Sequence, residues 1–190
     1  MESATTDSTT YDERFHISVS ENMPSLEECT NFVNDPTCGA ISTFVGITRD
    51  NFQGKRVLKL SYEGYVPMAE KQLRILCMDA ISPNNYPTVK KIAAVHVLGD
   101  CPVGHASVIL AVSSPHRTEA IHCCEYLINE LKARIPIWKL ETYEEVSPNG
   151  ETGTTTTSSV WKENIEWKQG KQQRVMKKVE QEETTTTTTT

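Results

Sequence analysis

Two basic side chains stand at the start of a predicted helix, a position suited to binding an anion. His116 and Arg117 follow Ser114 and Pro115, which favour the N-cap and the first helical position. A helix N-terminus presents free N–H groups and partial positive charge, so a cation there is mildly unfavourable unless an anion is bound. Imidazole, guanidinium and backbone N–H groups together indicate a phosphate or carboxylate site. A solvated helix start is the simpler alternative.

Further cations follow in the same stretch. Lys132 and Arg134 lie at the end of this helix, where they complement the negative pole of the helix dipole and so have a purely structural explanation. Lys139 differs, because it alternates with apolar neighbours in the strand predicted after Pro136. Partly buried there, it could exchange protons near neutrality as a general acid or base. On a strand with one solvated face it would have no such role.

A sixth cation, Arg49, is placed at the end of a strand. The segment 38–48 is mostly small and β-branched, and the turn residues Asp50, Asn51 and Gly54 follow Arg49. Edges between strand and loop often carry functional residues, although an exposed loop arginine is the ordinary case.

The order of periodic segments predicts an α+β fold. Helices are predicted to begin at Ser25, in a capping box with Glu28, at Pro67 and at Ser114. The third helix has an apolar face at three- and four-residue spacing, formed by Ala120, Ile121, Cys124, Leu127, Ile128 and Leu131. Strands are predicted at 15–19, 38–48, 57–65, 89–98, 107–113 and 137–143, with a hairpin across 48–58 and a linker at 99–105. This order indicates a single domain with a mainly antiparallel sheet and about three helices.

Composition excludes several classes of protein. The net charge of −6 argues against nucleic acid as a partner and favours a small anionic ligand bound by a local cluster of cations. The N-terminus resembles no secretory signal, and no apolar run is long enough to span a membrane, which indicates a cytosolic protein. The six cysteines form no CxxC pair, and His96 and His105 are isolated, so no metal site and no cofactor is predicted.

The ends of the chain differ from its centre. Residues 1–13 are rich in Ser, Thr and Asp and are predicted to be disordered. One folded domain is predicted at 14–167, interrupted by a flexible insertion at 147–159. Residues 168–190 form a low-complexity tail that ends in seven threonines.

Several of these stretches together resemble a known family. The signatures are FVGITRDN at 44–51, LSYEGYVPMA at 60–69, SPHR at 114–117 and LKARIPIWKLE at 131–141, with WKEN at 161–164 weaker. In their joint spacing they resemble the large, catalytic subunit of molybdopterin synthase, over residues 15–164. The resemblance implies that family's α/β-hammerhead-type fold.

The resemblance also implies a reaction. In that family a ubiquitin-like small subunit carries a thiocarboxylate at its C-terminal glycine and donates sulfur to cyclic pyranopterin monophosphate, which forms the dithiolene of molybdopterin. The family's catalytic residues correspond to Lys132 and Lys139. Its substrate-binding residues correspond to Arg49, His116, Arg117, Lys132, Lys139, Leu140 and Glu141. The chain departs from the family in its long insertion and in having Asn164 and Ile165 where some members place a basic residue.

Assembly follows from the length of the third helix. If residues 117–132 form one unbroken helix, fifteen steps of about 1.5 Å separate Arg117 from Lys132 by roughly 22 Å, too far for both to touch one small pterin. We therefore expect a homodimer with two shared sites. The resemblance independently implies a central dimer with a small subunit at each end. Two other functions stay open: a non-catalytic binding module for a ubiquitin-like protein, and a phosphate-ester hydrolase.

Overall fold

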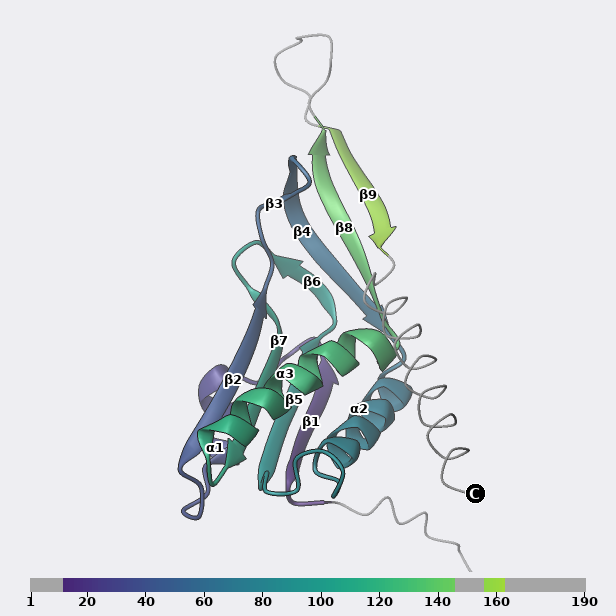
Figure 1. Cartoon of the computed structure of the whole chain (residues 1–190). Helices are drawn as coiled ribbons and strands as arrows, with labels where there is room; N and C mark the ends of the chain where they lie inside the picture. Colours follow the sequence, from purple (N-terminus) through teal and green to yellow (C-terminus); the bar gives the residue numbers. More distant parts are fainter. Residues whose placement is uncertain (1–11, 146–155, 163–190) are drawn as a thin grey trace, which may run out of the picture.

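The structure is a computed structural model that describes residues 12–145 and 156–162. It confirms the α+β class: three helices and two sheets lie in the described residues (Figure 1). Of the segment expected to be disordered, Asp12 and Glu13 form a turn in which Asp12 binds Arg14 at 2.7 Å. The tail at 168–190 and most of the insertion lie outside the described residues.

The first sheet forms the body of the molecule. Its strand order is β1-β5-β7-β2, with β1 and β5 parallel and the other pairs antiparallel. The strands are β1 (Phe15–Ser20), β5 (Lys91–Val97), β7 (Ala106–Ser114) and β2 (Ala40–Ile47). The central strands β5 and β7 are buried on both faces, which explains why their sequences are nearly continuous apolar runs.

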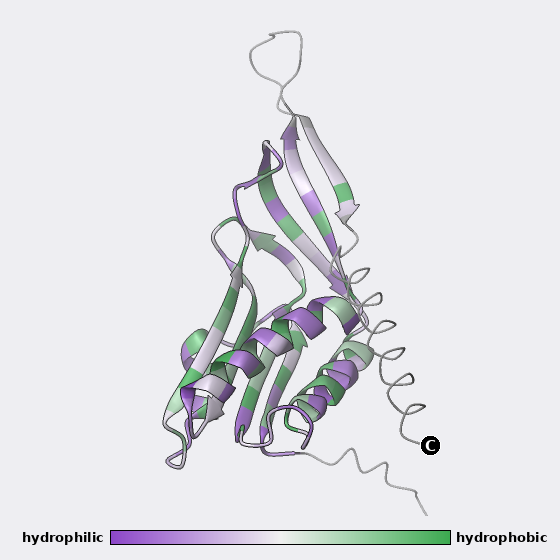
Figure 2. Ribbon diagram, in the orientation of Figure 1, coloured by the Kyte–Doolittle hydropathy of each residue, from purple (hydrophilic) through white to green (hydrophobic). Residues whose placement is uncertain are grey.

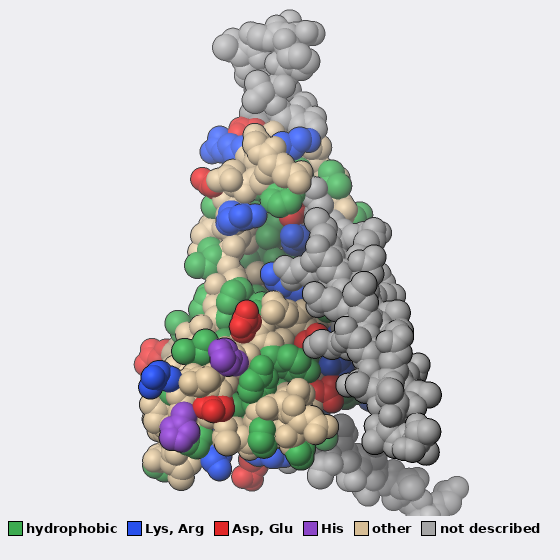
Figure 3. Space-filling view, viewed as in Figure 1, with side chains coloured by type: hydrophobic (Ala, Val, Ile, Leu, Met, Phe, Trp, Pro, Cys, Tyr) green, Lys and Arg blue, Asp and Glu red, His purple; other side chains and the backbone are tan. Residues whose placement is uncertain are grey.

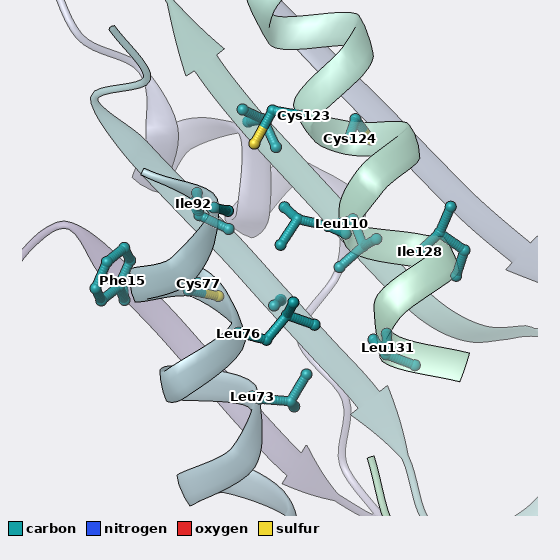
Figure 4. Packing of buried hydrophobic residues seen from close by; sticks show 14 of the residues in the cluster. Phe15, Leu73, Leu76, Cys77, Ile92, Leu110, Cys123, Cys124, Ile128 and Leu131 are labelled. Atoms are coloured by element: carbon teal, nitrogen blue, oxygen red, sulfur yellow. The ribbon is translucent and has the colours of Figure 1, made fainter. Parts of the chain in front are cut away.

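Helices cover both faces of this sheet. Helices α2 (Val66–Ala80) and α3 (Arg117–Arg134) pack on one face, and α1 (Leu26–Val33) on the other. In Figure 4, Leu76 of α2 and Leu131 of α3 belong to the same cluster of buried side chains as Leu110 of β7. The outer face of α3 is mainly hydrophilic, as expected for a helix whose other face packs on a sheet (Figure 2).

Local signals explain two of the helix starts. The Ser25 hydroxyl accepts from the Glu28 N–H at 3.2 Å, and the Glu28 carboxylate accepts from the Ser25 N–H at 2.7 Å, which confirms the predicted capping box. Pro67 lies in the first turn of α2, also as predicted. The prediction for α3 was wrong by two residues, because Ser114 pairs with Ala40 as the last residue of β7 and His116 is the N-cap. Pairing within the sheet outweighs the local capping preference of Ser114.

The second sheet projects beyond the first (Figure 1). Its strand order is β3-β4-β8-β9. Strand β6 also pairs with β4, on the same edge of β4 as β3. The strands are β3 (Asn51–Phe52), β4 (Lys55–Gly64), β8 (Ile137–Glu145), β9 (Thr156–Lys162) and β6 (Gly99–Pro102). Three expectations are corrected here. The insertion was predicted to run to residue 159, but strand β9 begins at Thr156. The segment 99–105 was predicted to be a linker, but part of it forms strand β6.

The third correction concerns the hairpin. Strands β2 and β4 were expected to pair, but β2 pairs with β7 in the first sheet, and the hairpin joins β3 to β4. Its two turn residues, Gln53 and Gly54, both have positive φ, at 51° and 78°. Positive φ at both positions matches the twist of a two-residue hairpin. The chain passes from the first sheet to the second between Ile47 and Asn51, the segment that contains Arg49.

Candidate functional site

A cavity of about 640 Å³ lies where the two sheets meet the C-terminal half of α3. Its wall is formed by the end of β2 and the β3 hairpin, by β4 and β8 of the second sheet, and by the last turns of α3. Arg49, Lys132, Lys139 and Glu141 all line it. Figure 3 shows Lys and Arg side chains gathered on the upper part of the face, over the second sheet.

Arg49 reaches the cavity from a firmly held backbone. The preceding residue, Thr48, is buried, and its N–H donates to the His105 carbonyl at 3.0 Å while its hydroxyl donates to the Cys101 sulfur at 3.3 Å. The Arg49 side chain is exposed, and its guanidinium lies 5.9 Å from the centre of the Phe52 ring. The strand end therefore fixes where this cation is presented.

Lys132 lies in the last turn of α3, with its side chain exposed at the cavity. Its turn is held on the core by Ile128 and Leu131. Arg134, two residues later, binds Asp79 of α2 at 2.9 Å. Both cations complement the helix dipole, but their contacts differ. Arg134 forms an ion pair that links α3 to α2, and Lys132 lines the cavity.

Lys139 and Glu141 form an ion pair within strand β8. The Lys139 Nζ lies 2.8 Å from Glu141 Oε1, and the Glu141 residue is 4% exposed. The second carboxylate oxygen, Oε2, accepts a hydrogen bond from the hydroxyl of Tyr143, which is also buried. Lys139 is half-buried, the first of the two alternatives that the sequence left open, and its ammonium contacts a carboxylate.

The buried part of the cavity wall also carries neutral polar side chains among apolar residues. Tyr62 and His96 meet edge to face with ring centres 4.8 Å apart, and Ser107 lies beside them. Burial lowers the pKa of His96 to about 4, and burial raises the pKa of Tyr62, so both are neutral near pH 7. His96 Nδ1 lies 2.7 Å from the Val97 carbonyl, which can only accept, so Nδ1 carries the proton of the neutral ring.

The sequence did not assign these neutral residues to a site. His96 was read as an isolated structural histidine, and Tyr62 as an ordinary strand residue. A signal for His96 was present, since it is the single ionisable residue among the apolar positions that follow Lys91 in β5. Tyr143 could have been noticed because it lies two residues after Glu141, and hence on the same face of a strand.

The structure does not bring the remaining predicted residues to this cavity. His116 and Arg117 are exposed at the N-terminal end of α3, and α3 is continuous from Arg117 to Arg134, as expected. Leu140 is not among the lining residues, because it alternates with Lys139 and Glu141 and so lies on the other face of β8.

The cysteines do not supply a nucleophile to the cavity. All six are free, none lines the cavity, and five are buried. Burial raises the pKa of Cys77 to about 12 and also raises that of Cys123, which keeps both thiols protonated. Within residues 12–145 and 156–162, no group of three His, Cys, Asp or Glu side chains is placed to hold a metal ion. No helix in this part of the chain is both long and apolar enough to cross a membrane.

This arrangement suits an anionic ligand with an uncharged polar body. Arg49 and Lys132 offer two exposed cations, Lys139 a third that is partly neutralised by Glu141, and the buried part of the wall offers neutral hydrogen-bonding groups. Because no thiol of this chain reaches the cavity, a sulfur nucleophile for covalent chemistry would have to come from a bound partner or substrate.

Comparison with known proteins gives the same picture in sequence and in structure. The model of the MoaE protein family matches residues 19–134. The molybdopterin synthase catalytic subunit of Bos taurus is 49% identical over 142 residues, which are 75% of this chain and 68% of the relative. Among solved structures, molybdopterin synthase from Staphylococcus aureus aligns with a TM-score of 0.65 and 30% identity, over 78% of this chain and 96% of that one. A complex of subunits 1 and 2 of molybdopterin-converting factor from Helicobacter pylori aligns with a TM-score of 0.50 and 22% identity, over 67% of this chain and 84% of that one.

Proposed function

Because this chain belongs to the MoaE family, whose curated relatives are catalytic subunits of molybdopterin synthase, we propose that it is the sulfur-transferring subunit of that enzyme. Sulfur passes from the C-terminal thiocarboxylate of a ubiquitin-like small subunit to cyclic pyranopterin monophosphate, and two transfers form the dithiolene. The observation that carries the proposal is the convergence of Arg49, Lys132 and Lys139 on one cavity.

The chemistry of the reaction matches the inventory of the cavity. The sulfur nucleophile comes from the partner, which agrees with the absence of a cysteine from the cavity wall. The substrate is a cyclic phosphate, so Arg49 can bind the anion and stabilise the charge that develops as the ring opens. The uncharged wall of Tyr62 and His96 suits the neutral pterin ring better than it suits the phosphate.

The two lysines differ in surroundings, and this supports different roles. Lys132 is exposed at the cavity mouth, where it can orient the partner's C-terminal tail or accept its acyl group. Lys139 is held as an ammonium by Glu141, so it suits the donation of a proton or a hydrogen bond during the loss of water.

The proposed function also indicates a protein partner and a cellular compartment. The Helicobacter pylori structure is a complex of two subunits of molybdopterin-converting factor, and we expect an equivalent small subunit to insert its tail beside Lys132. The six free cysteines support a reducing compartment such as the cytosol.

A homodimer would complete the site. Among the described strands, β2 is an edge of the first sheet with no partner on its outer side. Ile41 and Ile47 of β2 and Ile121 of α3 are 43%, 57% and 53% exposed. Exposed isoleucines at a sheet edge are typical of a surface that a second chain covers.

The register of β2 shows what such a dimer would do. If two β2 strands pair antiparallel about a two-fold axis perpendicular to the sheet, the Ala40 end of one strand lies beside the Ile47 end of the other. Ala40 pairs with Ser114, three residues before Arg117, and Ile47 precedes Arg49 by two residues. The dimer would therefore bring His116 and Arg117 of one chain toward the cavity of the other.

Reconstitution tests the proposed function. The protein is mixed with a thiocarboxylated small subunit and cyclic pyranopterin monophosphate, and the dithiolene product is measured; the same small subunit with an ordinary C-terminal carboxylate is the control. Product only with the thiocarboxylate is expected. Release of phosphate from phosphoesters without any partner would favour a hydrolase, and full activity of Lys132→Ala would favour a binding module.

A further inference from the structure

Three side chains of β8 form a continuous chain of polar contacts that ends in the cavity. Lys139, Glu141 and Tyr143 are two residues apart and therefore share one face of the strand. Lys139 Nζ contacts Glu141 Oε1 at 2.8 Å, and the Tyr143 hydroxyl donates to Glu141 Oε2. Lys139 and Glu141 line the cavity, and Tyr143 lies behind them.

We propose that Tyr143 is a positioning residue, which acts on Lys139 through Glu141 and fixes where the Lys139 ammonium stands in the cavity. The proposal rests on the proposed function, in which Lys139 contacts the substrate. Tyr143 itself is not among the residues that line the cavity.

The geometry of the carboxylate explains how a tyrosine controls a lysine two positions away. A carboxylate has two oxygens, and the hydroxyl of Tyr143 occupies Oε2, which leaves Oε1 for Lys139. The occupied oxygen also fixes the rotation of the carboxylate plane. Without the hydroxyl, the carboxylate loses one of the contacts that fix its rotation, and the ammonium that it binds is held less firmly at its position.

Burial makes this control effective. Glu141 is 4% exposed and Tyr143 2% exposed, so water competes poorly for the hydrogen bond between them. The Tyr143 ring is held in turn, because its residue pairs with Val57 of β4 and the Lys55 ammonium lies 5.5 Å from the ring centre.

The hydroxyl of Tyr143 stays protonated near neutral pH. Burial, together with the contact to Glu141, raises the pKa of Tyr143 to about 12. The hydroxyl is therefore a donor near neutral pH, and a carboxylate that accepts a hydrogen bond is favoured in its charged form.

Tyr143→Phe tests the proposal with little change in shape, because it keeps the buried ring and removes one oxygen atom. We expect kcat for dithiolene formation to fall about tenfold, as for loss of a hydrogen bond to a charged group, with little change in KM for the pterin precursor. The acidic side of the pH–rate profile should move toward neutrality, because Glu141 without this donor takes up a proton at higher pH. Tyr126→Phe, which removes a hydroxyl from a partly buried tyrosine outside the cavity wall, is the control and should match the wild type.

A double-mutant cycle separates positioning from a general effect on packing. If Tyr143 acts only through Glu141, then adding Tyr143→Phe to Glu141→Gln should lower kcat by no more than about twofold beyond Glu141→Gln alone. An additional tenfold loss in the double variant would show that Tyr143 acts by another route and would overturn the proposal.

A labelling experiment tests the same chain of contacts without sulfur transfer. An amine-reactive acylating reagent is applied to the whole protein, and modification of Lys139 is followed by mass spectrometry. Tyr143→Phe should raise the labelling rate of Lys139 several-fold, because a lysine side chain held less firmly against Glu141 is more accessible to the reagent, and should leave Lys71 of α2 unchanged. In the wild type, Lys139 should react more slowly than Lys91, which is also half-buried.

The outcomes distinguish this proposal from the function on which it rests. A wild type that makes no dithiolene would refute the proposed function, while the labelling result would still decide the role of Tyr143. Unchanged kcat, pH profile and labelling in Tyr143→Phe would refute the positioning role alone. Should Tyr143→Phe fail to fold, faster labelling of Lys139 than of Lys91 in the wild type would by itself contradict the proposal.

Discussion

Two inactive variants should restore each other's activity if the site is shared between two chains. Lys132 and Arg117 lie fifteen residues apart on one continuous helix, which separates them by about 22 Å at 1.5 Å per residue. One small pterin cannot touch both. In a Lys132→Ala homodimer every site lacks the lysine, and in an Arg117→Ala homodimer every site lacks the arginine.

A mixed dimer of the two variants differs. One of its sites takes Lys132 from the first chain and Arg117 from the second and is intact, whereas the other site carries both substitutions. Random exchange of subunits makes about half of all dimers mixed, so an equimolar mixture should recover about one quarter of wild-type activity. Mixed dimers purified through two different affinity tags should reach about half.

The control is a pair of variants that both change the same cavity, one at the end of α3 and one in the strand β8 that follows it. Lys132→Ala and Lys139→Ala both change the cavity of a single chain, so each site of their mixed dimer lacks one lysine and no activity should return. Dithiolene formation is the assay, and native mass spectrometry confirms the exchange of subunits. Confirmed mixed dimers of Lys132→Ala with Arg117→Ala that stay inactive would refute the shared site.

Three further predictions concern single residues. Lys132→Ala should abolish product formation but lower the unfolding free energy by only about 0.3–1 kcal/mol, the range for an exposed cation at a helix C-terminus; normal turnover would remove it from the mechanism. Arg117→Ala should weaken binding of the phosphate-bearing precursor by about 1.5–3 kcal/mol and binding of the small subunit far less, as measured by calorimetry with each ligand; equal losses would indicate a structural role. Burial lowers the pKa of His96 from 6.5 to about 4, so the unfolded chain binds its proton first, and stability should fall by about 3 kcal/mol as the pH drops from 6.5 to 4. His96→Gln should remove this part of the pH dependence in denaturant titrations, and an unchanged slope would show that other groups cause it.

Much of the fold could be predicted because its local signals agree with its tertiary contacts. The capping box at Ser25, Pro67 in the first turn of α2 and the apolar face of α3 each specify an element by themselves. The predictions failed where a partner distant in sequence decides the outcome. Ser114 has the chemistry of an N-cap but pairs with Ala40, and Ile121 fits the apolar period of α3 but is 53% exposed, because that side of the helix has no described neighbour.

The sequence by itself determined which cations are available and that the two ends of α3 cannot serve one ligand, because residue types and the rise of a helix are local properties. The tertiary structure alone decided which of those cations share a cavity. Arg49, Lys132 and Lys139 come from three elements that meet only after β2 has paired with β7 and β4 with β8. The neutral wall of Tyr62 and His96, and the contact of Tyr143 with Glu141, likewise depend on side-chain packing and strand register, which no local pattern in the sequence encodes.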